Sequence, residues 1–221
     1  MTACVIEDEI AVISLDEGKA NAVSHSLIDA VNDGLNKAES EAKAVLIRGK
    51  PNIFSAGFDL KEFKKGPEAT KQLVTRGTEV LLRIFMHPQP VIAECTGHAV
   101  AAGAFILLAA DTRLGTSGDF KIGLNETAIG FELPTFGLEF AKARLSKRHL
   151  QAAVVQAQLY DPDTAIDVGY LDSVHDADSV HDTAMACAKA LAALPGEAYG
   201  QNKRGLRGEI GAIIEASIAA A

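Results

Sequence analysis

The sequence contains no tryptophan and only three cysteines, and its positive charges are outnumbered by its negative ones. The cysteines, Cys4, Cys95 and Cys187, are odd in number and widely spaced, so we expect reduced thiols in a cytoplasmic protein. The six histidines form no metal-like cluster, and we expect no metal site. Residues 1–9 are acidic where a signal peptide needs a basic region and an apolar core, so we expect no such peptide.

The charge balance limits the partners that the chain can bind. Its 21 Lys and Arg residues against 29 Asp and Glu residues give a net charge of −8. No global basic field is therefore available for nucleic acid or for an anionic membrane, and any anion must be held by local basic residues. With 221 residues, 48% of them hydrophobic, the chain can form one large α/β domain. We divide it into a core at residues 1–195 and a short helical tail at residues 196–221.

Apolar periodicity predicts alternating strands and helices. A helix capped near Ser24 follows two short strands, and a third strand comes after it. Strands are expected at residues 5–6, 10–15, 44–47 and 91–95. Further helices are expected at residues 68–86, 138–145 and 148–159.

The apolar run at residues 99–110 is the centre of the chain. It is too short to cross a membrane and predicts a helix buried against a sheet. Its start collects four small residues, Ala101, Ala102, Gly103 and Ala104, which let a ligand approach the backbone closely. The first N–H groups of a helix are unpaired donors at the positive end of its dipole. The stretch therefore predicts either a site for a developing oxyanion or tight packing of the helix on its neighbour.

A second pair of small residues, Ala56 and Gly57, follows a strand and a turn. We expect it to open another helix, with Asp59 in the first turn. Two helix starts of this kind can jointly hold one oxygen atom. Asn125 and Glu126 lie downstream, so the chain would combine two N–H donors with one carboxylate.

These segments resemble the crotonase, or enoyl-CoA hydratase/isomerase, family. The motifs are FSAGFDL at 54–60, GHAVAAGA at 97–104, DTR at 111–113 and IGLNETAIG at 122–130, and the last is most similar to mitochondrial-type enoyl-CoA delta isomerases. The resemblance implies a ββα spiral with C-terminal helices, and an acyl-CoA substrate from fatty-acid β-oxidation. It also implies no cofactor beyond the substrate's coenzyme A, and a homotrimer or homohexamer.

By motif position, the resemblance implies that the N–H groups of Phe58 and Ala102 form an oxyanion hole for a thioester carbonyl. Each such donor is typically worth a factor of roughly 10² to 10³ in rate. Ala102 departs from the family's usual glycine, but its N–H survives the change if the local φ is negative. Substrate contacts are expected from residues around the two donors: Ala20, Ala56, Gly57, Asp59, Leu60, Lys61, Phe105 and Asn125.

The carboxylates decide which reaction we expect. The resemblance implies that a hydratase would carry two glutamates, one at the position of Phe105 and one at Glu126. Phe105 cannot transfer a proton. A single carboxylate in an apolar pocket, with its pKa raised by desolvation, can move a proton between two carbons of an allylic system. We therefore expect a shift of a β,γ double bond to the α,β position, with Glu126 as the proton shuttle.

Several alternatives remain open from the sequence. A second acid or base from Glu94, His98 or Glu132 would restore hydration of a 2-enoyl-CoA. A chain that kept the pocket but lost turnover would be a non-catalytic acyl-CoA-binding protein. A serine hydrolase is disfavoured, since Ser55 and Ser117 lack a recognisable base partner and no nucleophile-elbow pattern occurs. The tail carries basic residues that either are solvated or reach a coenzyme A phosphate: Lys203, Arg204 and Arg207.

Overall fold

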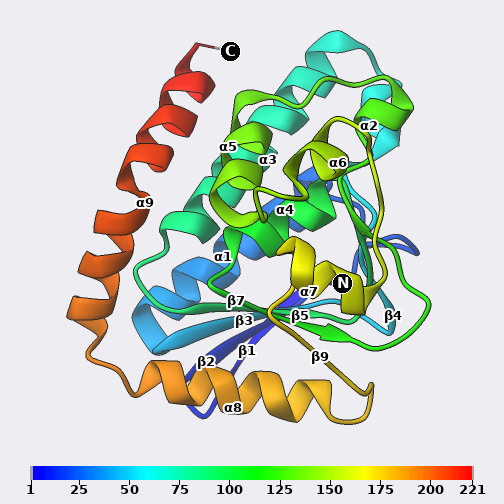
Figure 1. Cartoon of the computed structure of the whole chain (residues 1–221). Coiled ribbons are helices and arrows are strands. Elements are labelled where there is room, and N and C mark those ends of the chain that lie inside the picture. Colours follow the sequence, from blue (N-terminus) through cyan, green and yellow to red (C-terminus); the bar gives the residue numbers. More distant parts are fainter. Residues whose placement is uncertain (1, 221) are drawn as a thin grey trace.

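Two parallel-rich sheets form the frame of the computed structural model, which describes residues 2–220 (Figure 1). The larger sheet has the strand order β1-β2-β3-β5-β7-β9, in which β1 and β2 are antiparallel and the later neighbours are parallel. The smaller sheet is parallel, with the order β4-β6-β8. The strands are β1 (Ala3–Glu7), β2 (Ile10–Ser14), β3 (Ala44–Arg48), β4 (Asn52–Ser55), β5 (Val91–Cys95), β6 (Gly97–Val100), β7 (Thr112–Thr116), β8 (Ile122–Gly123) and β9 (Ser173–His175).

Both faces of the larger sheet are buried, which explains why its central strands are almost continuously apolar. Helix α8 (Val180–Ala192) covers one face and lies below the sheet in Figure 1. Helices α1 (His25–Glu41), α3 (Pro67–Met86) and α4 (Ala102–Ala109) pack over the other face. The expected ββα spiral with C-terminal helices is therefore confirmed.

Several predicted elements agree closely with the structure. Ser24 caps α1, as expected, by accepting a hydrogen bond from the Leu27 N–H at 3.2 Å. The helix expected at 148–159 is shorter, because Tyr160 exchanges two backbone hydrogen bonds of 2.9 Å with Ile122. The remaining helices are α2 (Leu60–Phe63), the 3₁₀ turn η1 (Thr127–Ile129), α5 (Thr135–Arg144), α6 (Leu150–Val154), α7 (Pro162–Val168) and α9 (Gly196–Ala219).

The two small-residue segments differ from the expectation. Residues 97–100 form β6 and α4 begins at Ala102, so the first two residues of the expected helix, 99–110, are extended. No helix begins at Gly57, whose φ is +98°. Instead the chain stays extended and α2 starts at Leu60, with Asp59 as its N-cap rather than a member of its first turn. The Asp59 carboxylate accepts the Lys61 N–H at 2.9 Å, which favours this later start.

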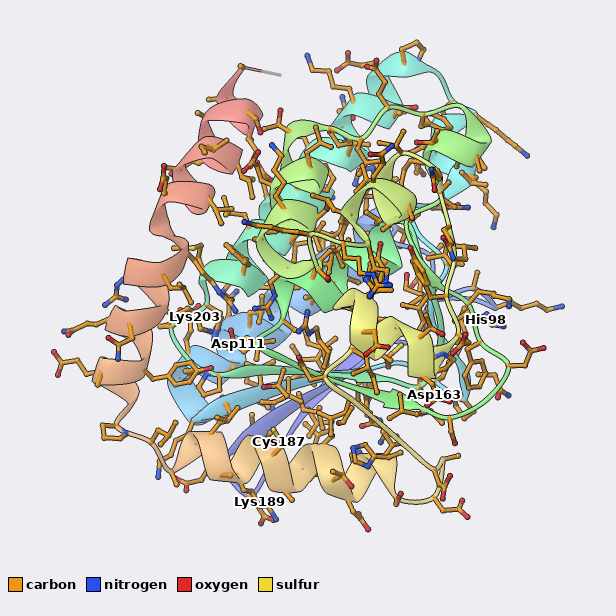
Figure 2. The ribbon with its side chains drawn as sticks, viewed as in Figure 1. His98, Asp111, Asp163, Cys187, Lys189 and Lys203 are labelled. Carbon is orange, nitrogen blue, oxygen red and sulfur yellow. The ribbon has the colours of Figure 1, made fainter. Side chains whose placement is uncertain are left out.

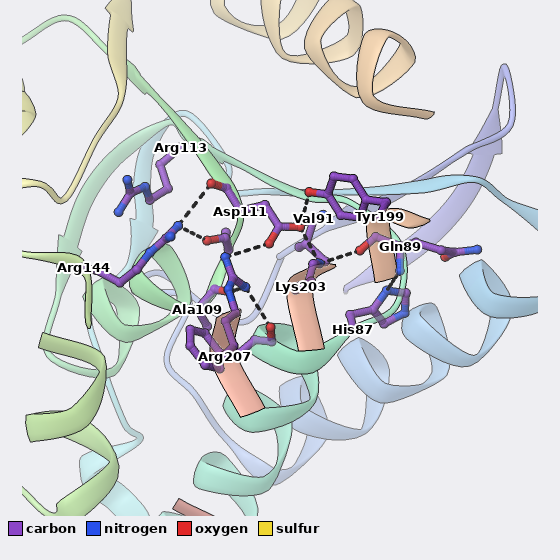
Figure 3. A network of polar contacts seen from close by, with 12 residues as sticks. His87, Gln89, Val91, Ala109, Asp111, Arg113, Arg144, Tyr199, Lys203 and Arg207 are labelled. Atoms are coloured by element: carbon purple, nitrogen blue, oxygen red, sulfur yellow. Dashed lines mark hydrogen bonds and ion pairs between the residues drawn. The ribbon is translucent and has the colours of Figure 1, made fainter. Parts of the chain in front are cut away.

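The C-terminal helix α9 is fastened to the core by a buried carboxylate, Asp111 (Figures 2 and 3). Asp111 forms ion pairs with Lys203 at 2.5 Å and Arg207 at 2.9 Å, and the Tyr199 hydroxyl donates to it at 3.0 Å. Burial lowers the pKa of Lys203 to about 8. Lys203 and Arg207 are therefore neither solvated nor directed to a coenzyme A phosphate, whereas Arg204 is exposed.

None of the helices within residues 2–220 is both long enough and apolar enough to cross a membrane.

Candidate active site

A cavity of about 340 Å³ lies where the β4–α2 loop, α2, α3 and the start of α4 meet residues 125–136. Most of its wall is apolar, and two carboxylates, one amide and one hydroxyl interrupt it: Glu126, Glu132, Asn125 and Thr70. A largely apolar cavity with a few polar groups is the usual form of a small-molecule site. Its aromatic wall consists of five phenylalanine side chains: Phe58, Phe63, Phe105, Phe131 and Phe136.

Glu126 sits between β8 and η1 and presents its carboxylate to this cavity. Burial raises the pKa of Glu126, because the apolar surroundings disfavour the charged form. Its Oε2 atom is buried and has no hydrogen-bond partner among the described residues, and the same holds for Oδ1 of Asn125. A buried carboxylate oxygen without a partner is uncommon and is available to a bound molecule.

The two expected N–H donors lie on adjacent backbone segments. Val23 pairs with Gly57 and Asp59 through hydrogen bonds of 2.8 and 3.1 Å, which leaves the Phe58 N–H on the other side of the strand without an acceptor in residues 2–220. Ala102 is the first residue of α4, so its N–H has no intrahelical partner. A Cβ atom on Gly57 would lie 3.5 Å from the Ala102 nitrogen. The two N–H groups therefore lie on neighbouring segments, and neither has an acceptor among residues 2–220.

The backbone dihedral angles show whether Ala102 can stand at the position where the family usually has glycine. Ala102 does not have a positive φ, so its N–H keeps the helical direction. The strained residue is Ala101, with φ +52° and ψ −124°. Its unusual dihedrals turn the chain sharply from β6 into α4. In the sequence, the departure from the family pattern lies at Ala102, the donor itself. In the structure, the backbone strain lies one residue earlier, at Ala101.

Asn21, which the sequence analysis missed, holds the β4 end of the site. Its buried side chain donates to the Leu15 and Phe54 carbonyls at 3.0 and 3.2 Å, and its own carbonyl accepts the Ser55 hydroxyl at 2.7 Å. Its φ of +45° is a backbone conformation that asparagine tolerates. The sequence feature that could have indicated the role of Asn21 is an asparagine within a polar loop that precedes a capped helix.

The remaining predicted contact residues divide into two groups. Ala56, Leu60, Phe105 and Asn125 line the cavity. Outside its lining lie Ala20, Gly57, Asp59 and Lys61. Ala20 accepts the Ala56 N–H at 3.0 Å and so positions a lining residue.

Three residues were open as a second acid or base. Glu94 is fully buried within the larger sheet, where it pairs with Arg48 at 3.0 Å and His181 at 2.8 Å. His98 accepts the Lys121 N–H at 2.9 Å and lies on the side of the molecule opposite to α9 (Figure 2). Neither lines the cavity, whereas Glu132 does.

Residues 2–220 contain no group of three His, Cys, Asp or Glu side chains arranged to hold a metal ion.

Comparisons with known proteins agree with this architecture. A family model described as enoyl-CoA hydratase/isomerase matches residues 5–216. A probable enoyl-CoA hydratase of Bacillus subtilis is 33% identical over 135 residues, which cover 59% of this chain and 52% of that protein. Mouse mitochondrial enoyl-CoA delta isomerase 1 is 26% identical over 191 residues, which cover 84% of this chain and 66% of that protein. The chain thus spans less than two thirds of the length of these two curated relatives.

A solved structure extends the similarity to almost the whole chain. The crystal structure of an enoyl-CoA hydratase/isomerase family protein from Pseudomonas syringae has a TM-score of 0.97 and 37% sequence identity to this chain. The alignment covers 99% of this chain and 95% of that one.

Proposed function

This chain belongs to the enoyl-CoA hydratase/isomerase (crotonase) family, and from that premise we propose that it moves the double bond of an enoyl-CoA thioester from the β,γ to the α,β position. The observation that carries the proposal is the Glu126 carboxylate, whose buried Oε2 atom faces an apolar cavity without a hydrogen-bond partner among the described residues. The N–H groups of Phe58, which lines the cavity, and of Ala102, which follows the lining residue Ala101, also have no acceptor there. Phe105 occupies the position at which the resemblance places a second glutamate.

In the proposed reaction, the thioester oxygen accepts hydrogen bonds from the Phe58 and Ala102 N–H groups. The Glu126 carboxylate removes a proton from the α carbon, and the electron pair of that C–H bond passes into an enolate. The two donors stabilise the negative charge that develops on oxygen. Glu126 then returns the proton to the γ carbon as the double bond moves, so the product is an isomer of the substrate.

The chemistry of this step sets its requirements. No water is added, nothing is oxidised or reduced, and the carboxylate returns to its starting state. The proposal therefore requires no cofactor beyond the coenzyme A that the substrate carries. The raised pKa of Glu126 supports the role, because a carboxylate with a higher pKa is a stronger base for a weakly acidic C–H bond.

Hydration of a 2-enoyl-CoA is the second candidate, and Glu132 is the observation that favours it. Its side chain lines the same cavity as Glu126, so the two carboxylates together can be considered for holding and activating a water molecule. Glu132 is exposed to solvent, however, and the segment that carries it lies at the rim. For this reason the isomerase remains the leading proposal.

The test gives the purified protein a trans-3-enoyl-CoA and, separately, a trans-2-enoyl-CoA, and follows the absorbance of the conjugated thioester. We expect conjugation to appear from the first substrate and to be lost in Glu126→Gln. Loss of conjugation from the second substrate, with solvent oxygen in the product and sensitivity to Glu132→Gln, would establish the hydratase instead. Absence of both activities with retained acyl-CoA binding would support a non-catalytic binding protein.

The proposal also covers the oligomeric state and the cellular location of the protein. We expect a homotrimer or homohexamer that acts on fatty-acid β-oxidation intermediates in the cytoplasm. The outward side of α9 supports self-association, because Leu206 is 79% exposed and Ile213 is 42% exposed there. Solution scattering at several concentrations tests the assembly, and a monomeric mass throughout would contradict it.

A further inference from the structure

Gly77 lies in the interior of α3, where glycine is a poor helix former. Its backbone does not require glycine, because its φ is outside the left-handed region. The reason for glycine is found in its neighbour. A Cβ atom at this position would lie 2.4 Å from Cε1 and 2.7 Å from Cζ of Phe58, far inside van der Waals contact. The missing side chain therefore leaves a recess in α3 that the Phe58 ring fills.

The recess lies on the face of α3 that borders the cavity. Thr70 and Val74 line the cavity, and Gly77 follows them at the i+3/i+4 spacing that places residues on one face of a helix. The Phe58 ring lies between this face and Phe63, with ring centroids 6.1 Å apart, and it also lines the cavity. The depth of the ring in the recess thus sets how far it extends into the cavity.

We propose that Gly77 is a positioning residue that determines which acyl groups the cavity accepts, by giving the Phe58 ring its place outside the acyl space. The proposal rests on the proposed function for the identity of the ligand as an acyl-CoA. With alanine at position 77, the ring has to withdraw by about 1 Å to restore the 3.4 Å of an ordinary contact. The helix backbone is fixed by its hydrogen bonds, so the ring tip moves toward the cavity and reduces its volume.

The experiment compares Gly77→Ala, Phe58→Leu and the double variant with the parent protein on 3-enoyl-CoA substrates of four and ten carbons. We expect Gly77→Ala to lower kcat/KM about tenfold for the longer substrate and less than about threefold for the shorter one, because pocket volume discriminates by chain length. The shorter leucine does not reach the new methyl group. The double variant is therefore expected to regain the longer substrate, and the unequal loss for the two chain lengths separates this role from a general folding defect.

Gly205→Ala is the matched control, since it makes the same change inside α9 where a Cβ atom meets nothing within 4 Å. It is expected to keep the parent's ratio between the two substrates. An equal loss for both chain lengths in Gly77→Ala, or a loss that Phe58→Leu does not relieve, overturns the inference.

Failure of the proposed function is distinguishable from failure of this inference. If the parent protein turns over neither enoyl-CoA, the dissociation constants of saturated four- and ten-carbon acyl-CoA are measured by calorimetry on the same variants. Gly77→Ala is then expected to weaken binding of the longer ligand selectively. Unchanged affinities for both ligands, or a parent that binds neither, overturn the inference.

Discussion

Phe105 and Phe136 pack edge to face, with ring centroids 5.2 Å apart and ring planes at 69°. Both rings line the cavity that contains Glu126, and Phe105 is otherwise fully buried. Gly137 makes room for this contact, because a Cβ atom there would lie 2.8 Å from Cζ of Phe105. An aromatic pair thus occupies the wall where the resemblance to hydratases places a second glutamate.

The first prediction concerns this wall. Phe105→Glu is expected to lower the isomerisation rate, because the new carboxylate disturbs the apolar wall and introduces a second charge. It is also expected to raise hydration of trans-2-enoyl-CoA about tenfold or more, since a placed acid or base contributes typically 10²- to 10⁴-fold. The rates are measured by loss of thioester conjugation and by incorporation of labelled oxygen.

Phe105→Leu provides the control for this substitution, because it keeps the wall apolar and adds no proton-transferring group. Its hydration rate is expected to equal that of the parent protein. If Phe105→Glu folds, as judged by circular dichroism, and shows no gain over Phe105→Leu, the wall does not limit hydration.

The second prediction concerns Glu126 and separates its role in catalysis from its effect on the free energy of unfolding. Glu126→Gln is expected to lower kcat by about 10²- to 10⁴-fold, because the amide cannot accept the α-proton. The same change is expected to raise the melting temperature at pH 7. The native pKa of Glu126 is raised by burial, so the unfolded chain loses this proton at lower pH than the native state does. Stability therefore falls as the pH rises from the unfolded to the native pKa.

Thermal unfolding of both proteins between pH 4 and pH 8 measures this effect. The difference in stability is expected to vanish below the unfolded pKa of about 4.3 and to grow as the pH rises. Glu132→Gln, at an exposed carboxylate of the same cavity, is the matched control and is expected to change stability little. A lower melting temperature for Glu126→Gln would contradict a destabilising effect of burying the Glu126 carboxylate, whose Oε2 atom has no partner among the described residues.

Much of the frame follows from local pattern. The strand at 44–47, the cap at Ser24 and the strand at 91–95 are set by apolar periodicity and capping chemistry, and each agrees with the structure. The resemblance indicated Glu126, Phe58 and Phe105 for a similar reason, because each belongs to a contiguous motif, and all three line one cavity. Short-range signals are sufficient where the apolar pattern or the capping residue of an element lies within a few neighbouring residues.

The predictions made from the sequence fail where tertiary contacts determine the local structure. Phe58 pairs with Val23, which lies 35 positions earlier in the chain, and this contact keeps the segment extended instead of helical. Lys203 and Arg207 read as a basic tail, because nothing near them in sequence indicates Asp111, more than 90 positions earlier. The importance of Gly77 also depends on a ring that comes from another element.

The third prediction concerns the fastening of α9. Asp111→Asn removes the carboxylate that faces Lys203 and Arg207, whose side chains are 5% and 7% exposed. Breaking a buried ion pair by removing one partner costs about 3–5 kcal/mol, so we expect a loss of this size in the free energy of unfolding. Urea unfolding measures it, and limited proteolysis should show earlier cleavage within residues 196–219.

A control substitution and a pH dependence make the prediction for Asp111→Asn specific. Asp119→Asn is the control, because that side chain is 99% exposed and a surface pair contributes little. The pKa of Lys203 is lowered to about 8, so between pH 8 and the usual lysine pKa of about 10.4 the unfolded chain binds more protons than the native state. Stability is therefore expected to gain from this group as the pH rises through that interval. A loss below about 1 kcal/mol in Asp111→Asn would show that other contacts hold α9.

The last prediction uses two neighbouring alanines with opposite backbone requirements. Ala101 has a φ of +52°, a region that glycine occupies freely, whereas Ala102 begins α4 without a positive φ. Ala101→Gly is expected to raise the free energy of unfolding by about 1 kcal/mol, because a strained residue of this kind costs about 1–3 kcal/mol and added chain entropy offsets part of the relief. Ala102→Gly is expected to lower it by up to about 1 kcal/mol. Urea unfolding measures the free energy of unfolding of both variants, which can be compared directly if their m-values are equal. The N–H group of residue 102 should remain a donor in both. Equal destabilisation by both substitutions would mean that the turn into α4 stores no strain at Ala101.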